Sequence, residues 1–135
     1  MTLSEIMDLH QGREGPLLPI LNDVQAEFGH VSEASIRTIA ELLNLTRAEV
    51  YGVVSFYHDY KSAPETRPVV KLCRAEACQA RGVDALVTAG ERQSRVKVEA
   101  VYCLGLCAVG PAAMVGDSVF ARLDAVTFSE LLESA

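Results

Sequence analysis

The sequence predicts an α+β protein in which a helical bundle, residues 1–66, precedes an α/β domain, residues 67–135. Apolar residues of the first part recur every three to four positions, which is the period of a helix. The second part contains short runs of β-branched residues bounded by turn residues, which is typical of strands. The proline-containing segment 62–68 separates the two patterns and marks the domain boundary. Since 50% of the 135 residues are hydrophobic, the chain has ample apolar material for a core.

Start and stop signals delimit the helices of the first part. A short stretch of mixed apolar and polar residues, 2–9, stops at the glycines that follow it. The next helix opens at Pro16 and ends at Gly29, and Ser32 can cap another that ends at Asn44. Residues 46–49 read Thr-Arg-Ala-Glu, a capping box that opens a third helix. The side chains expected to face the core of this bundle are Ile20, Leu21, Val24, Phe28, Ile36, Ile39, Ala40, Leu43, Val50, Val53, Val54 and Tyr57.

The second part predicts the element order β-α-β-β-β-α. Strands are expected over 69–72 and 96–101, with a helix over 83–89 between them. Residues 112–115 and 119–123 flank the turn sequence Gly-Asp-Ser, which predicts a hairpin, and a closing helix begins at Asp124 or Thr127. This order fits a thioredoxin-like α/β layer. The helical side chains expected to point inward are Val83, Leu86, Val87, Val126, Phe128, Leu131 and Leu132.

The net charge of −6 lies entirely in the first part. Residues 1–66 carry four Lys or Arg against ten Asp or Glu, whereas residues 67–135 carry eight of each. An acidic bundle repels phosphate backbones, so no nucleic-acid partner is expected. A docked protein surface, or plain solubility, explains the acidity better.

The sequence also bears on the compartment. No stretch approaches the roughly 20 apolar residues that span a bilayer, and the N-terminus has neither the basic start nor the apolar run of a signal peptide. The sequence therefore predicts a cytoplasmic protein with no membrane partner. In the reducing cytosol, four cysteines are expected to be metal ligands rather than disulfides.

All four cysteines lie in two tight pairs, Cys73 with Cys78 and Cys103 with Cys107. Each pair follows a predicted strand, so both are expected at the same edge of one sheet. Two thiolates on one tetrahedral metal, with bonds of about 2.3 Å, must lie roughly 3.8 Å apart. A short loop can bring them that close, and Gly105 offers the positive φ that such a loop can require. Two thiolates for each of two irons match a [2Fe–2S] cluster.

Two other uses of the cysteines remain open on spacing alone. Gaps of two to four residues also suit a structural four-cysteine zinc site. Dithiol exchange is a minor alternative, because each pair has more intervening residues than a thioredoxin redox motif.

Four segments carry a resemblance to a known family. Residues 73–78 read Cys-Arg-Ala-Glu-Ala-Cys, and residues 103–107 read Cys-Leu-Gly-Leu-Cys, followed by Pro111. Residues 25–31 read Gln-Ala-Glu-Phe-Gly-His-Val, and residues 50–57 read Val-Tyr-Gly-Val-Val-Ser-Phe-Tyr. Together, over residues 16–123, these motifs resemble the 24-kDa subunit of NADH dehydrogenases. The sequence of residues 73–80 is most similar to that of the gamma subunit of cytosolic NAD-dependent, molybdenum-containing formate dehydrogenases.

This resemblance implies a function in electron transfer. It implies a thioredoxin-like [2Fe–2S] domain, with Cys73, Cys78, Cys103 and Cys107 as ligands, and a partner subunit that carries FMN and binds NAD(H). The parent enzyme it implies is an NAD-dependent formate dehydrogenase with a molybdenum-containing catalytic subunit. The alternative is the corresponding subunit of an NADH dehydrogenase or of a hydrogenase diaphorase module. Only 24 residues separate Cys78 from Cys103, fewer than respiratory members have, so the contacts of their longer loop are not expected here.

No residues of a catalytic or nucleotide-binding site are evident. The sequence has no glycine-rich phosphate loop and no recognisable nucleophile–base set, so the chain is expected to be a non-catalytic subunit. Residues 36–57 resemble a helix-turn-helix, but the second helix offers Arg47 and then mostly apolar residues, which disfavours DNA reading. The three histidines are expected to be surface or capping residues. The side chains expected to meet a partner beside the cluster are Arg74, Glu76, Leu104, Leu106 and Val109, although both leucines can instead pack on their own domain.

Overall fold

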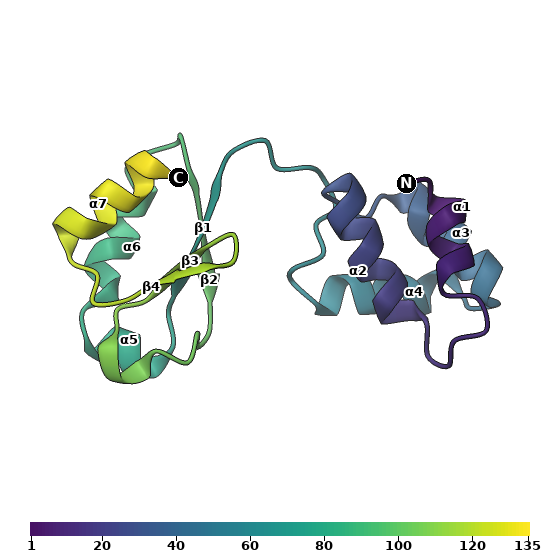
Figure 1. Ribbon diagram of the computed structural model, residues 1–135, viewed down its shortest axis with the longest axis horizontal. Coiled ribbons are helices and arrows are strands. Elements are labelled where there is room, and N and C mark those ends of the chain that lie inside the picture. Colours follow the sequence, from purple (N-terminus) through teal and green to yellow (C-terminus); the bar gives the residue numbers. More distant parts are fainter. The chain divides into compact units, whose positions relative to one another are not determined.

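A computed structural model describes all residues from 1 to 135 (Figure 1). The chain forms two compact units, Met1–Glu65 and Thr66–Ala135, and each has its own buried apolar core. None of the helices combines the length and the apolar character that crossing a bilayer requires.

Four helices make up the first unit: α1 (Leu3–Leu9), α2 (Leu17–Phe28), α3 (Glu33–Leu43) and α4 (Arg47–Phe56). The predicted boundaries of the last three helices are confirmed by their caps. Gly29 ends α2 with φ 72°, and Asn44 ends α3 with φ 55°. The hydroxyls of Ser32 and Thr46 accept hydrogen bonds from backbone amides at the starts of α3 and α4, and Thr46 forms the predicted capping box with Glu49. The short stretch predicted at 2–9 contains the full helix α1, and its N-cap Thr2 forms a second capping box with Glu5.

The core of the first unit contains most of the predicted residues. Leu43 and Val53 are half-buried and pack against it. Phe28 and Tyr57 are exposed, contrary to prediction. Each stands at a helix end, and Tyr57 has the extended conformation φ −90°, ψ 106°, so the helical period no longer sets its direction. The buried residues are Ile6, Ile20, Leu21, Val24, Val31, Ile36, Ile39, Ala40, Val50 and Val54.

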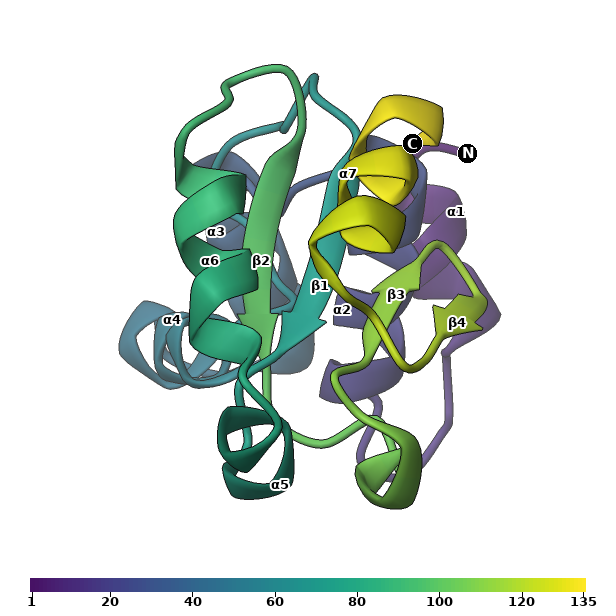
Figure 2. The same cartoon turned by 90° about the vertical axis from the view of Figure 1, so that its left-hand side faces the viewer.

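The second unit is built on a four-stranded mixed sheet of order β2-β1-β3-β4 (Figure 2). Strands β1 (Val69–Cys73) and β2 (Lys97–Val101) are parallel, and β3 (Ala113–Val115) and β4 (Ser118–Phe120) are antiparallel to their neighbours. Helix α6 (Val83–Glu91) connects the two parallel strands, and α7 (Ala125–Ser134) closes the chain with Asp124 as its N-cap. The predicted element order is therefore confirmed.

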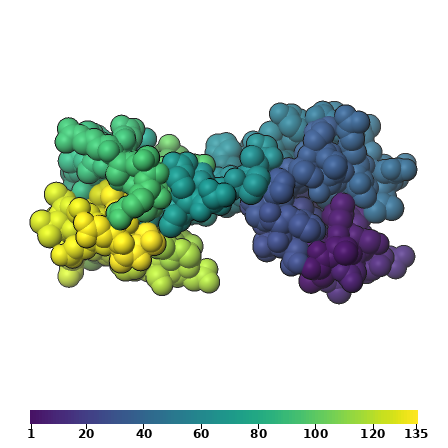
Figure 3. Space-filling view, turned by 90° about the horizontal axis from the view of Figure 1, so that it is seen from above, coloured from purple at the N-terminus to yellow at the C-terminus, as the bar shows by residue number.

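Helices α6 and α7 cover the same face of the sheet (Figure 2), and α7 lies at the surface beside α6 (Figure 3). Their buried side chains include Val83, Leu86 and Phe128, which is fully enclosed. Val126 was expected inward but is 66% exposed. Two residues correspond to about 200° of helix rotation, so Val126 lies on the opposite side of α7 from Phe128.

Three local features depart from the predicted pattern. A short helix, α5 (Glu76–Ala80), and a 3₁₀ turn, η1 (Cys107–Val109), lie in the two cysteine segments, where no helix was predicted. The hairpin strand expected over 119–123 ends at Phe120, because the chain turns through Arg122, which has φ 50°. The Leu123 amide then donates a hydrogen bond to the carbonyl of Pro111.

Candidate functional site

The two cysteine pairs come off the same edge of the sheet, as predicted. Strands β1 and β2 run in parallel, and Cys73, the last residue of β1, lies opposite Val101, the last residue of β2. Cys103 follows two residues later. The Arg74 amide donates a hydrogen bond to the Val101 carbonyl at 2.8 Å, which holds the two strand ends together where the loops begin. In Figure 2, α5 and the 3₁₀ turn both lie at the end of the sheet towards which β1 and β2 point.

The first pair is enclosed by the protein. Cys73 is 2% exposed and Cys78 is 3% exposed. After Cys73 the chain turns through Ala75 into α5, whose third residue is Cys78, and this returns Cys78 to the side of Cys73. The two thiols share a hydrogen bond. Side chains of a strand alternate between its two faces, so a strand alone cannot bring the two thiols together. The short helix α5 does so.

The second pair lies at the surface. Cys103 and Cys107 are exposed, and their sulfur atoms are 3.6 Å apart. This separation is close to the roughly 3.8 Å required of two thiolates on one tetrahedral metal. The loop reaches it through two positive φ angles, 76° at Cys103 and 77° at Gly105, and then enters the 3₁₀ turn. The positive φ predicted for Gly105 is confirmed, whereas that of Cys103 had no signal in the sequence.

Backbone amides link the second loop to the first pair. The Cys103 amide donates to the Cys73 sulfur at 3.4 Å, and the amides of Ala75 and Leu104 donate to the same sulfur. Burial acts to raise the pKa of Cys73, but these donors, together with the Cys78 thiol, outweigh it and lower the pKa. Three amides aimed at one sulfur favour its anionic form. Metal binding requires that form.

The other sulfurs have different surroundings. Burial, followed by the hydrogen bond with Cys73, raises the pKa of Cys78, although the Ala112 amide opposes this. The hydrogen bond with Cys103 raises the pKa of Cys107. In each pair the hydrogen bond between the two thiols favours a protonated sulfur, and a bound metal ion would take the place of that proton.

The donor set fits a two-iron cluster better than a single ion. A four-cysteine zinc site places all four thiolates around one metal. In the structure, no group of three or more Cys, His, Asp or Glu side chains is arranged to hold one ion. The thiols instead form two pairs that the Cys103 amide connects, and a [2Fe–2S] cluster takes two thiolates on each iron.

Gly110 closes the site over Cys78, a contact that sequence reasoning missed. A Cβ placed on Gly110 would lie 2.9 Å from the Cys78 sulfur, so the backbone here approaches closer than most side chains allow. The peptide between Gly110 and Pro111 is cis. Nothing in the sequence indicated that the backbone of Gly110 would approach Cys78.

The remaining candidate residues lie apart from this chemistry. All three histidines belong to the first unit: His10 contacts Asp23 at 2.6 Å, and His30 contacts the Phe28 carbonyl at 3.0 Å. Arg47, the one base-reading candidate on α4, makes two hydrogen bonds to Glu33 and lies over the ring of Tyr51. These contacts favour a structural role for Arg47 over DNA binding.

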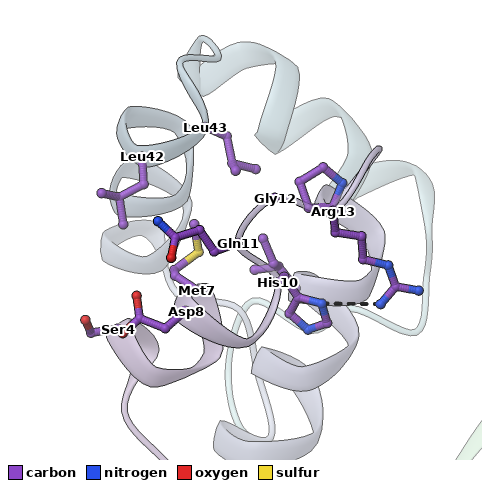
Figure 4. Close-up of a pocket in the computed structure, with 11 residues that line it drawn as sticks. Ser4, Met7, Asp8, His10, Gln11, Gly12, Arg13, Leu42 and Leu43 are labelled. Carbon is purple, nitrogen blue, oxygen red and sulfur yellow. Dashed lines mark hydrogen bonds between the residues drawn. The ribbon is translucent and has the colours of Figure 1, made fainter.

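The first unit also contains a pocket of about 420 Å³ between α1, the loop after it, and the end of α3 (Figure 4). Its lining includes Met7, His10, Arg13 and Leu43, and Arg13 contacts His10 at 3.4 Å. No cysteine lines it.

Comparisons with known proteins agree with this geometry. Residues 3–135 match the family described as thioredoxin-like [2Fe–2S] ferredoxin. The chain is 30% identical to the NADP-reducing hydrogenase subunit HndA of Solidesulfovibrio fructosivorans, over 82% of this chain and 71% of that protein. It is 32% identical to NADH-quinone oxidoreductase subunit 2 of Thermus thermophilus, over 86% of this chain and 74% of that protein. These relatives confirm the resemblance to the 24-kDa subunit family.

Among solved structures, the chain is similar to part of an NAD⁺-reducing [NiFe]-hydrogenase in its air-oxidised state. The TM-score is 0.68, and the match covers 88% of this chain and 22% of the hydrogenase chain, at 24% identity. This likeness confirms the predicted fold, and the chain spans about a fifth of that larger polypeptide.

Proposed function

Because the chain belongs to the thioredoxin-like [2Fe–2S] ferredoxin family, we propose that it is the electron-transfer subunit of an NAD-linked oxidoreductase of the NADH dehydrogenase or hydrogenase type. Cys73, Cys78, Cys103 and Cys107 are the proposed ligands of its cluster. The assignment is supported chiefly by the two close thiol pairs, which lie at one edge of the sheet. Backbone amides also donate hydrogen bonds to the Cys73 sulfur.

The residues of this chain hold and tune the cluster. A bound [2Fe–2S] group supplies one-electron transfer. The amides of Ala75, Cys103 and Leu104 stabilise negative charge on the Cys73 sulfur, and the burial of Cys73 and Cys78 keeps water from one side of the site. The reducing cytoplasm is the compartment in which these thiols stay available.

The proposed partner is a subunit that carries FMN and binds NAD(H), with which the cluster exchanges electrons. The sequence of this chain has no phosphate-binding loop and no acid–base set of its own. Nicotinamide chemistry therefore takes place on another polypeptide, and this chain acts as a one-electron relay.

A formate dehydrogenase with a molybdenum subunit is the second candidate for the parent enzyme. This candidate rests on the sequence of residues 73–80 alone. The relatives named above are subunits of a hydrogenase and of an NADH-quinone oxidoreductase, which favours the first candidate. Metal analysis of the complex that co-purifies with the chain separates the two, since nickel and molybdenum mark different catalytic subunits.

Iron and sulfide analysis of the purified chain tests the cluster itself. We expect about two iron and two sulfide per chain, and an electron paramagnetic resonance signal of spin 1/2 only after reduction. Changing any one of the four cysteines to Ala is expected to abolish or severely destabilise the cluster, whereas His30→Ala keeps the iron content. A colourless chain that contains one zinc would replace this assignment with a structural zinc site.

A further inference from the structure

The two halves of the cluster site differ sharply in exposure. Cys73 and Cys78 are buried under α5 and the Gly110 backbone, whereas Cys103 and Cys107 lie at the surface. One thiol pair therefore faces the protein interior, and the other faces outward. Any partner that exchanges electrons at short range meets the outward pair first.

The stretch of chain that carries the outward pair contains no charged side chain, although Arg74 and Arg122 flank it and donate backbone hydrogen bonds to Val101 and Val109. Residues 100–116 contain no Asp, Glu, Lys or Arg, although at the 22% charged content of the chain about four would be expected in such a stretch. Seven residues of this stretch are exposed, among them both thiols of the outward pair: Ala100, Tyr102, Cys103, Gly105, Cys107, Ala108 and Gly116. An exposed segment without charged residues beside a redox site is typical of a surface that another protein covers.

Tyr102 is the prominent side chain on this surface. It is 70% exposed, more than any other large hydrophobic residue of the second unit, and it directly precedes Cys103. Leu104 and Leu106, the apolar residues expected to meet a partner, are half-buried and pack against the core of their own unit. They are therefore structural supports of the loop, and Tyr102 takes the place expected of them. Tyrosine is enriched among the anchors of protein interfaces because a rigid ring contributes much area for little entropy.

We propose that Tyr102, Gly105, Ala108 and the exposed thiol pair form the docking surface for the flavin-bearing subunit, with Tyr102 as its anchor. The proposal rests on the proposed function and identifies the surface through which the electron crosses. The matching partner surface is an uncharged recess that receives the Tyr102 ring, since a charged group there would lose water without gaining a partner. Covering the loop also removes water from the exposed side of the cluster.

Three variants of the cluster-loaded chain test this. Tyr102→Ala removes the anchor, Tyr102→Phe keeps the ring, and Val126→Ala changes an equally exposed side chain on α7. The measurement is binding to the flavin-bearing subunit purified from the same complex, with the absorption spectrum of the cluster recorded for each variant. We expect Tyr102→Ala to weaken binding about 30-fold or more, as interface anchors do, with the other two within about threefold of the wild type. All spectra are expected to stay unchanged.

The outcomes separate this proposal from the assignment of the cluster. A Tyr102→Ala chain that keeps its cluster and binds the flavin subunit normally would overturn the docking surface and leave the proposed function standing. A purified wild-type chain that contains no [2Fe–2S] cluster would instead contradict the proposed function. If sedimentation shows that Tyr102→Ala dissociates a dimer of this chain, the surface joins two copies, and the proposed partner is wrong.

Discussion

Backbone amides dominate the surroundings of the Cys73 sulfur. Three of them, from Ala75, Cys103 and Leu104, converge on it from loops that are 30 residues apart in sequence. Because these donors belong to the backbone, their effect on the sulfur does not depend on which side chains the three residues carry. The proposed cluster site therefore depends mainly on the backbone path of two loops, and the four cysteines are its proposed ligands.

A surface ion pair at Glu33 gives a separate residue-scale prediction. The hydrogen bonds from Arg47 and then Arg37 lower the pKa of Glu33 from 4.5 to about 2. A lowered pKa stabilises the folded form above pH 4.5, and this contribution is lost as the pH falls from 4.5 towards 2. Glu33→Gln is thus expected to lower stability at pH 7 and to leave it nearly unchanged near pH 2. Urea unfolding followed by circular dichroism at both pH values measures this.

Glu41→Gln, also exposed on α3, is the matched control for that comparison. A Glu33→Gln chain with wild-type stability at pH 7 would show that the exposed pair contributes nothing measurable, as many surface pairs do.

At the scale of elements, the sequence predicted most of what local signals encode. Gly29, Ser32 and Asn44 are recognisable helix boundaries, because each satisfies a backbone requirement within one or two residues of itself. The two strands that precede the cysteine pairs were also predicted, and their parallel pairing in the structure places both pairs at one edge. Helix α5 and the 3₁₀ turn were not predicted, since five and three residues are too short for a periodic pattern. The approach of Gly110 to Cys78 was equally invisible, because it depends on contacts distant in sequence.

Helix α7 gives the element-scale prediction. Phe128 is fully buried between this helix and the sheet, so Phe128→Ala leaves a cavity and is expected to destabilise the second unit by about 3–5 kcal/mol. Loss of the cluster absorbance during denaturation reports this unit, and it should occur at lower denaturant. Val126→Ala on the exposed side of the same helix is the control and should change little. Equal effects of the two changes would mean that α7 does not close the core.

At the scale of the whole molecule, the net negative charge lies in one unit and the four cysteines lie in the other. The first unit carries ten acidic and four basic side chains, and residues 67–135, which hold all four cysteines, have no net charge. Within residues 67–135, the stretch 100–116 has no charged residue, so burying it against a partner removes no charge of its own from water. The acidic unit can still act over a distance on a basic partner, because electrostatic attraction speeds encounter more than it strengthens the final complex.

Ionic strength tests this separation of roles. The Debye length shrinks from about 30 Å at 0.01 M salt to about 8 Å at 0.15 M, so attraction by the acidic unit should fade across that range. We expect the association rate with the flavin-bearing subunit to fall about tenfold, with the dissociation rate nearly constant. Neutralising Asp8, Glu14 and Glu41, three exposed acids of the first unit, to the corresponding amides should flatten this dependence without altering the cluster spectrum. Stopped-flow mixing measures both rates. An association rate that is the same at low and high salt would show that the acidic unit contributes to solubility alone. The weaker binding of Tyr102→Ala comes from faster dissociation, so it is expected at every salt concentration.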